Sequence, residues 1–141
     1  MSETARQASS GRDLAERLGF EPSQTVLVFG RGGECDQALR ASIEEVTGAE
    51  VVNEEYADAV DVVLLWWRRD DGDLRDTLTR AKESLADGGR IWLLTPKVEH
   101  DGYVDPSEIN DSGQAAGLGQ TSSITLTRNW LAACLQPPAV M

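Results

Sequence analysis

Continuous apolar runs alternate along this chain with segments whose apolar residues recur every three or four positions. The clearest unit lies between residues 61 and 96, where an apolar run, a helical segment and a second apolar run follow one another. The helical segment carries a stripe of apolar residues, whose members are Leu74, Leu78, Ala81 and Leu85. Two apolar strands joined by one helix form the crossover unit of a parallel sheet. The pattern therefore predicts an α/β fold.

Capping residues mark both ends of this predicted helix. Asp73 stands before its first apolar position, where a carboxylate accepts hydrogen bonds from first-turn amides. Gly88 and Gly89 follow it and are expected to supply the left-handed exit from the helix. The next strand, residues 91–95, should end at Pro96, because proline cannot donate to a strand ladder.

The first 29 residues divide into a polar leader, a helical segment and an apolar run. Residues 1–10 are small, polar and uncapped, which predicts a disordered leader ahead of one domain over residues 11–141. Two leucines at helical spacing predict a short helix over residues 12–19. Residues 25–29 form a continuous apolar run that ends at a glycine, as expected of a strand covered on both faces.

A second helix is predicted after this first strand. Asp36 is its expected cap and Gly48 its expected end. Its apolar face is formed by Leu39, Ile43 and Val46. Residues 49–53 then predict a short second strand, which an acidic linker separates from the unit described first.

The C-terminal third is predicted to hold one helix and one strand pair. Asp105 and Pro106 form a cap and first helical position, and Gly117 lies past the far end. Residues 121–126 and 130–135 favour an antiparallel edge hairpin, with a helix as the alternative for the second segment. Together the elements predict a three-layer, Rossmann-like α/β domain with a mostly parallel sheet and a C-terminal antiparallel edge strand pair.

Charge and composition exclude several classes of function. The 141 residues include 13 lysine and arginine against 24 aspartate and glutamate, a net charge of −11, so nucleic acid would be repelled. Cys35 and Cys134 are far apart and His100 is the only histidine, so a zinc site is not expected. No segment has the apolar length of a signal peptide or a membrane span. We therefore expect a cytoplasmic protein with no membrane association.

The order of strand, glycine loop, helix and strand, followed by the crossover unit and a terminal strand pair, resembles a shortened class I methyltransferase core over about residues 25–136. At finer grain, residues 62–67, 93–97 and 119–123 are similar to a family of small, acidic, uncharacterised actinobacterial proteins. That second resemblance brings no known activity with it.

The methyltransferase resemblance implies S-adenosylmethionine as a cofactor. Such enzymes carry an acid in the first strand and a Gly-x-Gly-x-Gly turn, whereas this chain has Val28 and Glu34 at the first and last of these positions. Both departures weaken cofactor binding, because Glu34 would place a carboxylate where the turn admits an anion. The cofactor-binding candidates that remain are Gly30, Gly32 and the ribose-binding acids Glu54 and Glu55.

The end of the strand at Trp66 and Trp67 is the second candidate region. Open α/β sheets bind ligands beyond the carboxyl ends of their strands. Successive side chains point to opposite faces, so one tryptophan is expected in the core and the other beside a ligand or partner. The full candidate surface consists of Trp66, Trp67, Arg68, Arg69 and Lys97. Structural packing of both tryptophans is the competing interpretation.

No catalytic residue can be assigned from the sequence. His100 has no serine and acid in the order that a catalytic triad needs, which makes it a weak general base. The leading hypothesis is a non-catalytic, cofactor-free binding or regulatory module that recognises a protein partner or a small anionic ligand. The alternatives are an S-adenosylmethionine-dependent methyltransferase or other enzyme that binds a small molecule or nucleotide, and a structural subunit of a larger complex. Exposed strand edges and an aromatic surface also leave a homodimer open.

Overall fold

The structure, a computed structural model, describes residues 18–30, 34–53, 56, 58–69, 71–97, 102–126 and 130–137, without the side chains of residues 34–36 and 87. The predicted leader and most of the predicted helix over residues 12–19 lie outside the described residues. The elements in chain order are β1 (Val26–Phe29), α2 (Glu34–Thr47), β2 (Val60–Trp66), α3 (Leu74–Glu83), β3 (Leu85–Pro96), α4 (Pro106–Ala115), β4 (Gly119–Thr125) and β5 (Trp130–Gln136).

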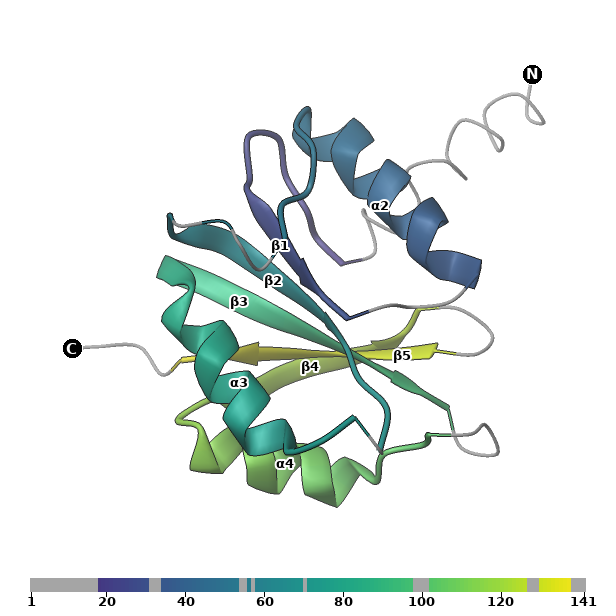
Figure 1. The fold of residues 1–141 in the computed structure, drawn as a ribbon, viewed down its shortest axis with the longest axis vertical. Helices are drawn as coiled ribbons and strands as arrows, with labels where there is room; N and C mark the ends of the chain where they lie inside the picture. The colour runs from purple at the N-terminus through teal and green to yellow at the C-terminus, as the bar shows by residue number, and fades with distance from the viewer. Residues whose placement is uncertain are drawn as a thin grey trace.

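One mixed sheet organises these elements (Figure 1). Its strand order is β1-β2-β3-β5-β4, and β1, β2 and β3 are parallel while β5 is antiparallel to both β3 and β4. The α/β class is therefore confirmed, but the parallel strands make up only one side of the sheet. The expected C-terminal strand pair is present: β5 is a strand rather than a helix, and β4 forms the edge.

The predicted strand over residues 49–53 is almost absent. Only Val52 joins the sheet, through an isolated parallel bridge to Leu27. This bridge adds a sixth strand of a single residue beside β1. The Val28 amide donates to the Val52 carbonyl at 2.9 Å, and the Val52 amide donates to the Val26 carbonyl at 2.8 Å. The run is too short to pair further, because exposed residues precede Val51 and exposed Asn53 follows Val52.

Helices cover both faces of the sheet, since α2 lies on one side and α3 and α4 lie on the other (Figure 1). Alternation along each strand divides the core accordingly, so that Val26 and Val28 face α2 while Leu27 and Phe29 face α3. This arrangement leaves the carboxyl ends of β1 and β2 beside the first turns of α3, where a ligand site is expected in an open sheet.

The exit from α3 differs from the prediction. The helix ends at Glu83 with Ser84 as its cap, and Leu85 already belongs to β3, where it pairs with Val60. Gly88 has a φ of +80° but lies inside β3, where the register shifts between Val60 and Val62. Gly88 therefore marks an irregularity in β3 rather than the end of a helix. Both features use the same left-handed backbone, so a glycine in the sequence does not distinguish them.

Two of the three predicted aspartate caps are confirmed, whereas Asp36 lies inside α2, which already begins at Glu34. Asp73 accepts the Asp76 amide at 3.3 Å, and Asp105 accepts the Ser107 amide at 2.9 Å. Proline follows Asp105 at the start of α4, as the sequence predicted. None of the helices that the structure describes is long and apolar enough to cross a membrane.

Candidate strand-end cavity

Gly30 ends β1 in a backbone conformation that only glycine adopts easily. Its φ is +78°, and a Cβ atom at this position would lie 2.6 Å from the carbonyl oxygen of Trp66. Strands β1 and β2 therefore approach so closely at their carboxyl ends that no side chain fits between them. This contact explains Gly30 without any cofactor.

Both tryptophans at the end of β2 are buried, and they lie on opposite faces as expected. Trp66 is 1% exposed and belongs to the α2 side of the core, whereas Trp67 is 4% exposed and belongs to the α3 side. Trp130 packs edge-on against Trp66, with ring centroids 4.9 Å apart and planes at 82°. Both side chains are therefore packed in the core, as the competing interpretation expects, and the placement of one of them beside a ligand or partner stays a prediction.

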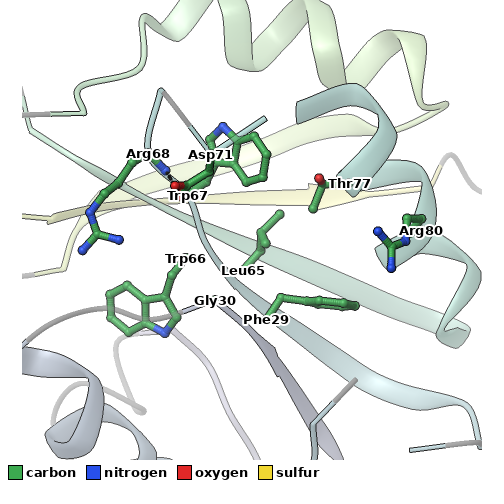
Figure 2. A pocket seen from close by; sticks show the side chains of 9 residues that line it. All are labelled: Phe29, Gly30, Leu65, Trp66, Trp67, Arg68, Asp71, Thr77 and Arg80. Carbon is green, nitrogen blue, oxygen red and sulfur yellow. Dashed lines mark hydrogen bonds between the residues drawn. The ribbon is translucent and has the colours of Figure 1, made fainter. Parts of the chain in front are cut away.

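A cavity of about 390 Å³ opens at this edge of the sheet (Figure 2). It falls within the volume range of small-molecule sites, about 300 to 1,000 Å³. The residues that line it are Phe29, Gly30, Leu65, Trp66, Trp67, Arg68, Asp71, Thr77 and Arg80. Four of the residues singled out from the sequence are among them: Gly30, Trp66, Trp67 and Arg68.

The apolar wall of the cavity comes from neighbouring strands. Phe29 and Leu65 are direct partners in the parallel ladder between β1 and β2, so their side chains lie next to each other on the α3 side. Trp67 follows Leu65 by two residues and belongs to the same side of the core. These three side chains make one continuous apolar surface.

A tight turn holds the polar corner of the cavity. The Arg68 amide donates to the Asp71 carboxylate at 2.8 Å, and the Asp71 amide donates to the Arg68 carbonyl at 2.9 Å. The Arg68 guanidinium carbon lies 4.9 Å from the centre of the Trp130 ring, a cation–π contact. The Asp71 carboxylate is therefore already hydrogen-bonded within this turn.

Helix α3 contributes two lining residues that the sequence did not reveal, Thr77 and Arg80. The Thr77 hydroxyl donates to the Asp73 carbonyl at 3.0 Å, so its proton is engaged within the first turns of the helix. Arg80 is exposed and comes from the next turn of the helix. The only sequence signal for them was their position beside the apolar stripe at Leu74 and Leu78.

The remaining candidates lie elsewhere. Lys97 and Arg69 do not line the cavity, and the Arg69 amide instead donates to the Gly102 carbonyl at 2.9 Å. Gly32, Glu54 and Glu55 lie outside the described residues, so their predicted roles stay predictions. Within the described part of the chain, no group of three or more metal-ligating side chains gathers.

The described residues fit S-adenosylmethionine poorly. The position of the expected acid is occupied by Val28, which is 5% exposed and packs in the α2 side of the core. Among the described lining residues the one carboxylate is that of Asp71, which is engaged in the turn. The described lining therefore holds no carboxylate besides that of Asp71 for the hydroxyl groups or the amino group of this cofactor.

Several solved structures with a similar fold are methyltransferases. The CcbJ methyltransferase of Streptomyces caelestis superposes with a TM-score of 0.62 at 13% identity, over 93% of this chain and 90% of that one. The mitomycin 7-O-methyltransferase MmcR, at 13% identity, and CalO1, a methyltransferase in calicheamicin biosynthesis at 16% identity, both give 0.62 over 93% and 97% of this chain. This chain spans only 53% and 55% of those two proteins. The protein therefore has a class I methyltransferase-like fold.

Sequence comparison identifies its family. Residues 15–139 match the family described as protein of unknown function DUF3052, and the chain belongs to this family. Uncharacterised proteins of Mycobacterium tuberculosis and Mycobacterium bovis are each 42% identical to it over 135 residues, which cover 96% of this chain and 85% of theirs. The expected resemblance to uncharacterised actinobacterial proteins is thus confirmed.

Proposed function

We propose that this protein is a non-catalytic binding module that holds a small organic molecule in the strand-end cavity. The observation that carries the proposal is the cavity itself, which lies beyond the carboxyl ends of β1 and β2. Open α/β sheets bind their ligands at this position. Its apolar wall of Phe29, Leu65 and Trp67 would bury the body of such a molecule.

The polar groups of the cavity support binding rather than catalysis. Asp71 and Thr77 are each engaged in one hydrogen bond with a local backbone group, at 2.8 Å and 3.0 Å. The other charged lining residues among those described are arginines, whose guanidinium groups carry donors and no acceptor. A general acid and base pair would need groups that exchange a proton near neutral pH.

Two substitutions on α3 test the proposal. Thr77 and Thr79 both donate their hydroxyl to the carbonyl four residues earlier, at 3.0 Å and 2.9 Å, but only Thr77 lines the cavity. Thr77→Trp fills the cavity, and Thr79→Trp is its matched control on the exposed side of the same helix. Thermal unfolding is measured for both variants and the wild type against nucleotides, aromatic acids, S-adenosylmethionine and S-adenosylhomocysteine.

A ligand of the cavity has a defined signature in this experiment. It stabilises the wild type and Thr79→Trp by about 2.7 kcal/mol at a concentration one hundred times its dissociation constant, and leaves Thr77→Trp unchanged. Stabilisation of all three proteins to the same degree places the binding site elsewhere and contradicts the proposal.

The second candidate function is an S-adenosylmethionine-dependent methyltransferase. It is favoured by the likeness of the fold to methyltransferases, among them CalO1, whose structure is an S-adenosylhomocysteine-bound form. Under this alternative, S-adenosylmethionine and S-adenosylhomocysteine would stand out from the rest of the panel. A structural subunit that docks through exposed tryptophans has less support, since Trp66 and Trp67 are both buried.

A further inference from the structure

We infer that the ligand of the strand-end cavity is a small aromatic carboxylate, whose carboxylate pairs with Arg80 and whose ring lies against Phe29 and Leu65. This inference deepens the proposed function and rests on it. Two independent features of the cavity lead to it: its charge and the shape of its apolar wall.

The charge of the lining is opposite to that of the whole chain. Two arginines, Arg68 and Arg80, stand against the single carboxylate of Asp71 among the described lining residues, in a chain whose net charge is −11. A locally cationic cavity on an acidic protein attracts anions that the rest of its surface repels. The site therefore selects for negative charge.

Arg80 is the better placed of the two arginines. Its side chain is exposed, and no hydrogen bond or ion pair joins it to another residue in the described part of the chain. The Arg68 guanidinium instead lies over the Trp130 ring at 4.9 Å. Figure 2 shows the two guanidinium groups on opposite sides of the cavity, with Thr77 and Phe29 on the side of Arg80. One carboxylate would therefore meet Arg80 alone.

The apolar wall sets the shape of the ligand's body. Phe29 and Leu65 are ladder partners, so together they offer an extended surface rather than a narrow hole. A flat ring covers such a surface with little loss of conformational freedom, and it stacks favourably on an aromatic side chain. The cavity volume of about 390 Å³ accommodates a molecule of one or two fused rings.

The test compares a charged probe with its neutral counterpart. Isothermal titration calorimetry is carried out with 2-naphthoate and 2-naphthamide, which share one ring system and differ in charge. We expect 2-naphthoate to bind the wild type at least about tenfold more tightly, and added salt to reduce this difference. Equal affinities, or no binding of either probe, would overturn the assignment of an aromatic carboxylate.

Matched variants on α3 test whether Arg80 causes the preference for the charged probe. Arg80→Gln should abolish the preference for 2-naphthoate, and Arg80→Lys should retain part of it, because a lysine keeps the charge without the planar fork. Arg75→Gln removes an equally exposed arginine of the same helix that does not line the cavity, and it should bind both probes as the wild type does. An unchanged preference in Arg80→Gln would contradict the inference.

The same titrations separate this inference from the proposed function. If both probes bind equally and Thr77→Trp prevents both, the cavity is a binding site but does not select anions. If 2-naphthoate binds Thr77→Trp as tightly as the wild type, the probe binds outside the cavity and this inference fails, whereas the proposed function is decided by the thermal unfolding panel.

Discussion

Gly30 lies directly against the carbonyl of Trp66, so close that a Cβ atom at position 30 would stand 2.6 Å from the carbonyl oxygen. This contact brings the ends of β1 and β2 together and so forms the base of the strand-end cavity. The glycine that most resembles a methyltransferase cofactor loop is thus required by the packing of the strands.

Replacing Gly30 therefore tests the packing role. We expect Gly30→Ala to lower the free energy of unfolding by about 2 to 5 kcal/mol, because a left-handed backbone strain of about 1 to 2 kcal/mol adds to an overpacking penalty of about 1 to 3 kcal/mol. Chemical denaturation measures the loss.

Gly48 provides the control for the backbone term. Its φ is +81°, close to that of Gly30, but a Cβ atom there would meet nothing within 4 Å. Gly48→Ala should therefore show only the strain of about 1 to 2 kcal/mol. Equal losses in the two variants would mean that the Trp66 carbonyl moves aside and that the close approach is unimportant.

Trp130 is expected to anchor the C-terminal strand pair to the end of β2. It is 8% exposed, packs edge-on against Trp66 and lies beneath the Arg68 guanidinium. Trp130→Ala should lower the free energy of unfolding by about 3 to 5 kcal/mol. Trp130→Phe keeps an aromatic ring at the site and should lose clearly less, as measured by urea denaturation. A Phe variant as unstable as the Ala variant would argue against the ring contacts.

The cap of α4 gives a prediction about pH. The backbone amide of Ser107, and then its hydroxyl, lower the pKa of Asp105 below its ordinary value of 3.8. Because the folded pKa is lowered, the carboxylate stabilises the fold fully above the unfolded pKa, and this contribution is lost as the pH falls through the folded value. The effect is therefore confined to acidic solution.

Nuclear magnetic resonance titration of the Asp105 carboxyl carbon would measure this shift. We expect a midpoint below 3.8 in the wild type, and Ser107→Ala should keep most of the shift because the backbone amide is the larger cause. Asp105→Asn retains a capping oxygen but does not titrate, so acid unfolding of this variant should lack the corresponding contribution. A midpoint at or above 3.8 would contradict the cap interpretation.

Local signals explain why much of the fold was predictable. The caps at Asp73 and Asp105 and the apolar stripe of α3 as far as Ala81 are encoded in neighbouring residues, and the structure contains them. Gly88 shows the limit of such signals, because a positive φ serves a helix exit and a strand irregularity equally well. Which of the two occurs depends on the pairing of Leu85 with Val60, a contact that local sequence does not encode.

The cavity was only half predictable for a similar reason. Rules for strand ends identify Trp67 and Arg68, since they follow an apolar run directly. Thr77 and Arg80 line the same cavity only because α3 folds back along the sheet, and nothing in their spacing distinguishes them from other exposed helical residues. The burial of Trp67 likewise depends on Leu74 and Val104, which pack in the same part of the core.

The edge of the sheet gives the last prediction. Strand β4 is exposed along nearly its whole length, and its seven residues include no charge and no proline. The ladder to β5 shifts register between Gln120 and Ser122, so the regular part of the edge runs from Ser122 to Thr125. An edge without charges is a template for pairing with another strand. We expect two copies of the chain to associate through this edge.

Sedimentation equilibrium tests this association. A net charge of −11 on each copy opposes it, so the dimer fraction should rise as added salt screens the repulsion. Ser123→Lys places a charge in the regular part of the edge and should leave a monomer, whereas Gln114→Lys adds the same charge on exposed α4 and should still dimerise. A dimer that persists in Ser123→Lys forms through another surface, and a wild type that stays monomeric at high salt shows that this edge does not pair.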